Sequence, residues 1–310
     1  MYRPILSQAS VPLVTEVEVM DEAGRKKIIH IPGERPLTIF VNKQELVTLM
    51  TLGGEPEALV LGWLKNQRLI RSIEDVLSIQ VDWDVEAVAV TTRPEVLTLW
   101  NEAQKQRTVT TGCGQGSMFG DVLADMDGIK LPDATLAQAT LVDIVGAIRT
   151  QPSIYKQAGS VHGCAVFKNG VCQMFVEDVG RHNAVDKVIG WALQEGRLPL
   201  RGHALQVSGR ASAELVHKAV MAGVPLLAAV SAPSTLAVDL ARESGLTLVG
   251  SYVPKTSAQL AALLATSAVS PIELDVAALL DDNRRSPTLA AALAATQAAP
   301  AVVTAAALAA

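Results

Sequence analysis

Cys113 is the residue whose surroundings most favour chemistry. It lies in the segment TTGCGQGS with a glycine on each side, so the backbone there has few steric limits and we expect the thiol to be reachable. A reachable cysteine can form the thiolate, which is the nucleophilic form of the side chain. Cys164 and Cys172 instead lie in segments that favour strands, and we expect both to be structural. The sequence therefore predicts a reactive thiol at Cys113; the alternative is an incidental cysteine in a flexible loop.

A second candidate is the charged stretch FVEDVGRHNAVDKVIGWAL. Its apolar residues recur at helical spacing after Asn183, which is suited to cap that helix. Arg181 and His182 then lie in the turn before the helix, where unpaired backbone N–H groups favour an anion such as phosphate or carboxylate. The alternative is a well-capped helix in which Glu177 or Asp178 pairs with Arg181.

Two further segments, LQVSGRASAELVHKAVMAG and LAAVSAPSTLAVDLARESG, repeat one pattern of strand, Val-Ser turn, small polar loop and helix. Their candidate binding residues are Ser208, Gly209, Arg210, Ser231 and Ser234. At the carboxyl ends of neighbouring parallel strands, such residues let a ligand approach the backbone, and Arg210 adds a fork that fits phosphate. The pattern predicts a nucleotide-like pocket, although short strand-to-helix turns often use Ser and Gly without binding anything.

Metal-dependent and acyl-transfer chemistry have no support in the sequence. A zinc deaminase needs a His-x-Glu or Cys-x-Glu together with Pro-Cys-x-x-Cys, and the chain has no Cys-x-x-Cys. The five histidines show no ligand spacing, and no Gly-x-Ser-x-Gly nucleophile motif occurs. We therefore expect no metal site, and a deaminase-like hydrolase is a distant alternative.

The elements that position these residues form an α/β protein. Extended segments with turns at Ala23-Gly24 and near Asn42 precede a helix that begins at Pro56, which predicts a mixed α+β first lobe. Asn169-Gly170 joins two apolar runs as a hairpin. Beyond it, the order strand, helix, strand, helix, strand predicts parallel crossovers. We expect an N-terminal mixed lobe at residues 1–108, a mobile Cys loop and connecting helix at 109–160, an α/β binding lobe at 161–286, and an alanine-rich tail at 287–310.

Composition limits the remaining classes. Charged residues make up 18% of the chain, compared with about 25% in an average domain, and hydrophobic residues 49%. The net charge of −5 argues against a dominant nucleic-acid surface. The first residues lack the apolar core of a secretory signal, and the weakly apolar tail is interrupted by Gln297 and Pro300. We expect a cytoplasmic protein with no membrane anchor and a frayed tail.

Taken together, these motifs resemble the formate dehydrogenase accessory sulfurtransferase family, the FdhD type. The likeness runs from about Arg35 to Gly250 and is most specific in EDVGRHNAVDKVIG, SGRASAELVHKA and AGVPLLAAVSAPSTLAVDLA. The resemblance implies a cytidine-deaminase-like second lobe without the deaminase zinc, and a homodimer. It also implies that the protein receives sulfur from a cysteine desulfurase as a persulfide. The sulfur would pass to the bis-molybdopterin guanine dinucleotide form of the molybdenum cofactor, held in the predicted pocket, before that cofactor enters the formate dehydrogenase catalytic subunit.

The sequence departs from that family in two places. The family usually has Cys-x-x-Cys in the mobile loop, whereas Gly116 stands here in place of the second cysteine. One thiolate is enough to form a persulfide, so we expect Cys113 to carry sulfur; the alternative is a chaperone that binds the cofactor without transferring sulfur. The family's arginine-bearing cofactor segment is replaced by SYVPKT, whose candidate residues are Ser251, Tyr252, Val253, Pro254, Lys255 and Thr256.

Overall fold

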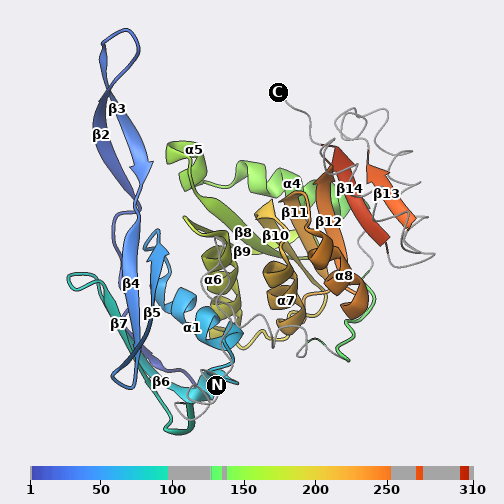
Figure 1. Cartoon of the computed structure of the whole chain (residues 1–310), viewed down its shortest axis with the longest axis horizontal. Coiled ribbons are helices and arrows are strands. Elements are labelled where there is room, and N and C mark those ends of the chain that lie inside the picture. Colours follow the sequence, from blue (N-terminus) through green and yellow to red (C-terminus); the bar gives the residue numbers. More distant parts are fainter. Residues whose placement is uncertain are drawn as a thin grey trace. The chain divides into compact units, whose positions relative to one another are not determined.

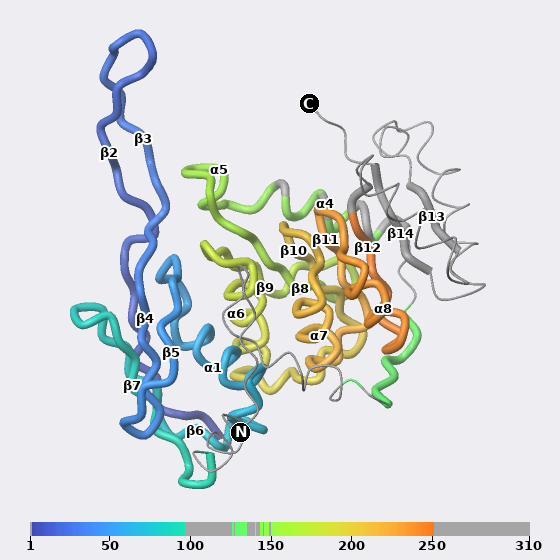
Figure 2. The backbone as a smooth tube through the Cα atoms, in the orientation of Figure 1, coloured from blue at the N-terminus to red at the C-terminus, as the bar shows by residue number. Residues whose placement is uncertain are grey.

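The computed structural model describes residues 2–96, 126, 128–134, 138–252, 270–274 and 301–306. Contacts divide the chain into two compact units built from interleaved segments (Figures 1 and 2). The first unit contains Met1–Leu123, Gln151–Cys164 and Phe175–Leu198, and the second contains Ala124–Thr150, Ala165–Met174 and Pro199–Ala310. The mixed α/β class expected from the sequence is confirmed. The contact-based units are not contiguous, unlike the lobes expected from the sequence.

The first unit contains a five-stranded sheet in the order β1-β6-β7-β4-β5 and a separate antiparallel pair, β2-β3. The strands are β1 (Ile5–Leu6), β2 (Val14–Met20), β3 (Lys26–Pro32), β4 (Arg35–Val41), β5 (Gln44–Thr51), β6 (Val76–Asp82) and β7 (Ala87–Thr92). Both predicted turns are present. Gly24 has φ 73° between β2 and β3, and Asn42 and Lys43 have φ 48° and 74° between β4 and β5. Positive φ at both central residues gives the tight turn that suits the twist of a hairpin.

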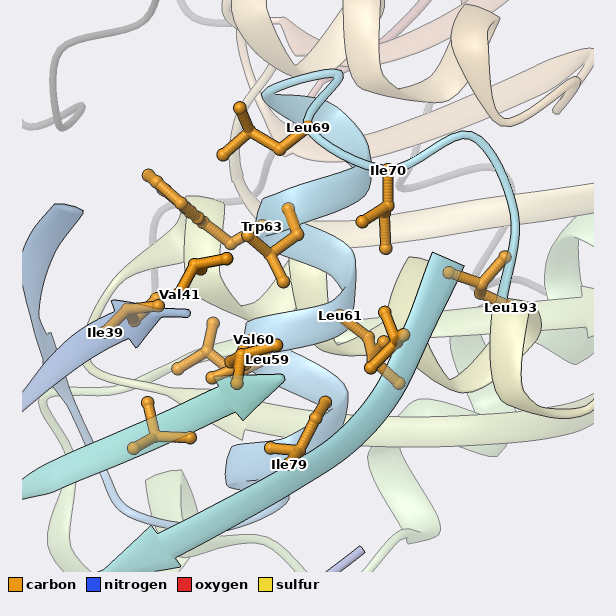
Figure 3. Packing of buried hydrophobic residues seen from close by; sticks show 14 of the residues in the cluster. Ile39, Val41, Leu59, Val60, Leu61, Trp63, Leu69, Ile70, Ile79 and Leu193 are labelled. Carbon is orange, nitrogen blue, oxygen red and sulfur yellow. The ribbon is translucent and has the colours of Figure 1, made fainter. Parts of the chain in front are cut away.

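Helix α1 (Pro56–Asn66) supplies the core of this unit. It begins at Pro56 as predicted, because proline's fixed φ suits the first helical turn. Leu59, Val60 and Trp63 of α1 are buried with Ile39 of β4 and Ile79 of β6, and Figure 3 shows these side chains filling the space between helix and strands. The burial of one helix face against a sheet stabilises both elements.

Helix α6 (Arg181–Gln194) packs antiparallel against α1 with their backbones in close approach. A Cβ added at Gly62 would lie 1.8 Å from the carbonyl oxygen of Asp186, and one at Gly190 would lie 1.8 Å from that of Ala58. Neither position can hold a side chain without moving a helix. The two glycines therefore set how closely α6 approaches α1. Among the described residues of this unit, the other helices are a 3₁₀ turn, η1 (Ile73–Asp75), and α5 (Ile154–Ala158).

The hairpin of β8 (His162–Lys168) and β9 (Val171–Asp178) belongs partly to each unit. Asn169 and Gly170 form its turn, with φ 51° and 76°, as the sequence predicted. β9 ends at Asp178, and α6 begins three residues later, so the turn between them is short.

The second unit contains most of a seven-stranded sheet in the order β13-β14-β12-β11-β10-β8-β9. Its elements are α4 (Gln138–Thr150), β10 (His203–Arg210), α7 (Ala213–Met221), β11 (Leu226–Ser231), α8 (Thr235–Ser244), β12 (Thr247–Tyr252), β13 (Ser270–Leu274) and β14 (Ala301–Ala306). β10, β11 and β12 are parallel neighbours, so the predicted succession of crossovers through α7 and α8 is confirmed.

The prediction of a frayed C-terminal tail was wrong for the residues of β14. Val302 and Val303 pair with Leu248 and Val249 of β12, which makes β14 a parallel strand of the second sheet. β-branched residues favour extended backbone, and the surrounding alanines obscured this preference in the composition.

Candidate functional site

The turn from β9 to α6 places Arg181 and His182 at the first two positions of the helix. The residue that precedes the helix is Gly180, and no side chain caps this end. The backbone N–H groups of the first turn therefore have no capping side chain, as an anion site requires. The prediction that Asn183 caps the helix was wrong, because the helix begins at Arg181 and Asn183 is its third residue. The side-chain amide of Asn183 donates to Met50 O at 2.7 Å and to Asp178 Oδ1 at 3.0 Å.

Asp178 and Lys187 form a fully buried ion pair beside this turn. Lys187 Nζ lies 2.7 Å from Asp178 Oδ2, and the two side chains are 1% and 0% exposed. Lys187 Nζ also donates to the carbonyl oxygen of Glu177 at 3.0 Å. Burying charges is costly unless each is paired and hydrogen-bonded, and here both conditions are met.

Arg181 is therefore not the partner of the acidic residues that precede it, contrary to the alternative considered from the sequence. Asp178 pairs with Lys187, and the carboxylate of Glu177 accepts from Ser153 Oγ at 2.7 Å and from the backbone N–H groups of Ile154 and Tyr155 at the start of α5. Arg181 is half-buried, and its Nε is buried with no hydrogen-bond partner in the described part of the chain. The guanidinium of Arg181 is thus not paired with either of these two carboxylates.

His162, at the start of β8, belongs to the same group of charges. Partial burial lowers its pKa, the nearby charge of Arg181 lowers it further, and the carboxylate of Asp178 opposes the shift. The imidazole is therefore neutral at pH 7, beside a fixed cation. The sequence interpretation missed His162; the hairpin register was the available signal, because a turn at Asn169-Gly170 places the start of β8 beside the end of β9.

In the second unit, the structure brings together the two Val-Ser segments. Arg210 at the end of β10 pairs in register with Ser231 at the end of β11, where the register shifts. Ser234 caps α8 by accepting from Ala237 N at 3.3 Å, and its own N–H donates to Ala211 O at 2.9 Å. The prediction that both segments lie at the carboxyl ends of neighbouring parallel strands is confirmed, with Arg210 exposed, Ser208, Ser231 and Ser234 half-buried, and Gly209 buried.

The end of β12 lies beside these segments. A Cβ at Gly250 would lie 2.8 Å from Pro233 Cδ and 3.5 Å from Ser231 O, so glycine is needed for this close approach. Ser251 and Tyr252 follow directly as the last residues of β12. The other candidates of this segment, Val253, Pro254, Lys255 and Thr256, lie outside the described residues. Arg181 and His182 belong to the first unit and the strand ends to the second, so a pocket shared between them stays a prediction.

The three cysteines differ as far as the structure describes them. Cys164 is fully buried in β8, and burial raises the pKa of its thiol far above the usual value. Cys172 of β9 is half-buried rather than in the core, and burial raises its pKa also. Both thiols are therefore protonated near neutral pH. Cys113 lies outside the described residues.

The described residues lack two further features. No group of three or more His, Cys, Asp or Glu side chains that could hold a metal ion occurs among them. None of the helices in that part of the chain is long and apolar enough to cross a membrane.

With the geometry in place, comparison with known sequences decides the family. The sequence profile of the FdhD/NarQ family matches residues 32–258. The chain belongs to the FdhD/NarQ family. A short C-terminal stretch, residues 246–309, also matches the profile of a nucleotide-binding C-terminal domain.

Curated members of the FdhD/NarQ family give the same result. The sulfur carrier protein FdhD of Nocardia farcinica is 42% identical over 227 residues, which cover 70% of this chain and 81% of that protein. The sulfur carrier protein FdhD of Sulfolobus acidocaldarius is 34% identical over 218 residues, covering 70% and 83%. A crystal structure from Desulfotalea psychrophila, of a protein provisionally assigned as a formate dehydrogenase accessory protein, is similar with a TM-score of 0.59 and 27% identity. It covers 77% of this chain and 93% of that one.

Proposed function

We propose that this member of the FdhD/NarQ family is a maturation factor for a molybdenum or tungsten formate dehydrogenase and that it carries sulfur as a persulfide on Cys113. Relatives at 42% identity are named sulfur carrier proteins, and a sulfur carrier needs a thiolate. The observation that supports Cys113 most is the state of the other two thiols: burial raises the pKa of both Cys164 and Cys172. Of the three cysteines in the chain, Cys113 is left as the carrier.

The first transfer step needs a single thiol on this protein. The Cys113 thiolate attacks the outer sulfur of a persulfide on a cysteine desulfurase, a new S–S bond forms at Cys113, and the desulfurase cysteine leaves as a thiolate. No oxidant or reductant enters this exchange. Gly116 stands in place of a second cysteine, so a neighbouring thiol at this position cannot attack the persulfide, displace its outer sulfur as hydrosulfide and leave a disulfide behind.

The acceptor of the sulfur would be the bis-molybdopterin guanine dinucleotide form of the molybdenum cofactor, bound as cargo. Its phosphates would lie against Arg181 and His182 at the start of α6, and against the Arg210 and Ser231 strand ends. The partners would be a cysteine desulfurase and the formate dehydrogenase catalytic subunit, in the cytoplasm, with this protein acting as a homodimer. A cytidine-deaminase-like arrangement of the second lobe also belongs to this proposal.

One observation favours a second candidate function. Gly116 stands where the resembled family has its second cysteine, so the protein would retain cofactor binding without sulfur transfer and act as a chaperone. The two candidates make different demands on Cys113, because only the carrier uses its thiolate.

Mass spectrometry separates the carrier from the chaperone. The protein is incubated with a cysteine desulfurase and cysteine, alkylated and digested, and we expect one additional sulfur on the peptide that contains Cys113. The Cys172→Ala variant, treated in the same way, should give the same result. A persulfide on Cys172 would contradict the assignment to Cys113. A folded protein with no persulfide on any cysteine would contradict the carrier function and favour the chaperone.

A further inference from the structure

The buried carboxylate of Asp178 has five polar neighbours, and they divide between its two oxygens. Oδ2 accepts from Thr51 Oγ1 at 2.6 Å and from Leu52 N at 3.3 Å, and it lies 2.7 Å from Lys187 Nζ. These contacts fix the end of β9 to the end of β5 and to the middle of α6. The oxygen that remains, Oδ1, is directed to the turn.

Oδ1 holds both sides of the segment that contains Arg181 and His182. It accepts from Gly180 N at 3.1 Å, just before those residues, and from Asn183 Nδ2 at 3.0 Å, just after them. The side chain of Asn183 is fixed further by its bond to Met50 O at 2.7 Å. Arg181 and His182 thus lie between two residues, Gly180 and Asn183, that both donate to the same carboxylate oxygen.

Lys187 removes an electrostatic conflict from this arrangement. A lone carboxylate three residues before a helix would repel an anion at the N-terminus of that helix. The ammonium group of Lys187 at 2.7 Å neutralises Asp178 inside the protein. Arg181, whose Nε has no partner among the described residues, then keeps its charge for a ligand instead of donating to Asp178.

From these contacts we infer that Asp178 is the positioning residue of the anion site at the start of α6: it orients Arg181 and His182 without touching the ligand. This inference rests on the proposed function, in which these two residues hold phosphate groups of the cargo. Both carboxylate oxygens of Asp178 already accept hydrogen bonds from other groups of the protein. Asp178 should therefore affect a ligand only through the positions of Arg181 and His182.

The test is a double-mutant cycle on GDP affinity, measured by titration calorimetry. Arg181→Ala should weaken GDP binding about tenfold, because a charged hydrogen bond to phosphate is lost. Asp178→Asn should weaken binding by a similar factor. The variant with both changes should be no more than about twofold weaker than either single variant, because residues that act through one contact are not additive.

A matched control separates positioning from general loss of stability. Asn66 Nδ2 donates to Asp186 Oδ1 at 2.5 Å and joins α1 to the same helix, five residues after Arg181. Asn66→Ala should lower the melting temperature and leave GDP affinity unchanged. If Asp178→Asn does not fold, Thr51→Val removes the 2.6 Å bond to Oδ2 and should weaken GDP binding in the same direction by a smaller factor.

The outcomes distinguish this inference from the function on which it rests. If folded wild type does not bind GDP, or if Arg181→Ala leaves binding unchanged, the proposed anion site fails and the role of Asp178 fails with it. If Arg181→Ala weakens binding but folded Asp178→Asn, or Thr51→Val in its place, binds like wild type, the positioning role alone is wrong. The positioning role would also be wrong if the double variant lost GDP affinity by the product of the two single factors. It would be wrong as well if Asn66→Ala lost as much GDP affinity as Asp178→Asn.

Discussion

The two groups of candidate binding residues are held by different physical means. In the first unit, Arg181 and His182 depend on a buried ion pair and on two helices whose backbones touch at Gly62 and Gly190. In the second unit, Arg210 and the serines of the strand ends depend on main-chain pairing and on helix caps at a half-buried surface. Buried charges and backbone contacts tolerate few substitutions, whereas caps and exposed strand ends tolerate many. Changes to the buried ion pair and to the two glycines of the first unit should therefore cost more stability than changes to the caps and exposed strand ends of the second.

The largest effect is expected for Lys187→Met. This change leaves the carboxylate of Asp178 buried without its counter-ion, and breaking such a pair costs about 3–5 kcal/mol of unfolding free energy. Urea unfolding measures this cost. The exposed Lys27→Met, on β3 of the same unit, should change stability by no more than about 0.5 kcal/mol. Equal stabilities for the two variants would show that the buried Lys187 contributes no more to folding than an exposed lysine.

The next largest effect is expected for Gly190→Ala. The added Cβ would meet the carbonyl oxygen of Ala58 at 1.8 Å, so α6 must move away from α1, at a cost of about 3 kcal/mol. Gly146 of α4 is the matched control, because a Cβ there meets nothing within 4 Å. Gly146→Ala should leave the melting temperature unchanged or raise it, since alanine favours helix. A Gly190→Ala variant as stable as wild type would show that the two helices are free to separate.

In the second unit, Arg210→Ala should change binding and leave stability unchanged. Arg210 is exposed at the end of β10, so its removal disturbs little packing. Loss of one charged hydrogen bond to phosphate should weaken GDP binding about tenfold in calorimetry. Arg201 is also exposed and lies just before β10, so Arg201→Ala is the control and should bind GDP as wild type does. Unchanged affinity in Arg210→Ala would exclude this strand end from the binding site.

The smallest effect is expected for Ser234→Ala. This variant loses the cap of α8, which accepts from Ala237 N at 3.3 Å, and such a loss costs about 1 kcal/mol. Ser234→Asp should recover the stability, since aspartate caps helices as well as serine does. If Ser234→Ala lost as much unfolding free energy as Lys187→Met, the strand ends of the second unit would be as sensitive to substitution as the buried ion pair of the first.

The sequence predicted the parts of the fold that depend on local signals. The Asn169-Gly170 turn, the Pro56 helix start and the parallel strands that end at Arg210 and Ser231 are all present, because turn chemistry and hydrophobic periodicity depend on consecutive residues. The order of the crossovers also predicted that Arg210 and Ser231 lie at the ends of neighbouring strands, but not the register shift that sets them opposite each other.

Long-range partners could not be predicted in the same way. Asn183 looked like a helix cap, but its amide is taken by Met50 O, more than a hundred residues earlier in the chain. Arg181 looked like the partner of Asp178, but Lys187 fills that place from the middle of the helix. Both errors arose because local patterns cannot show which distant groups compete for the same donor or acceptor.

Complementation with Cys113→Ala tests whether Cys113 carries sulfur. In cells that lack the native protein, this variant should bind the guanine dinucleotide cofactor almost as wild type does and leave formate dehydrogenase inactive. Cys172→Ala should restore activity, because Cys172 lies half-buried in β9 and takes no part in the proposed transfer. Of these two variants, we expect only Cys113→Ala to lose formate dehydrogenase activity. Activity equal to wild type in that variant would contradict the carrier and leave the cofactor chaperone in its place.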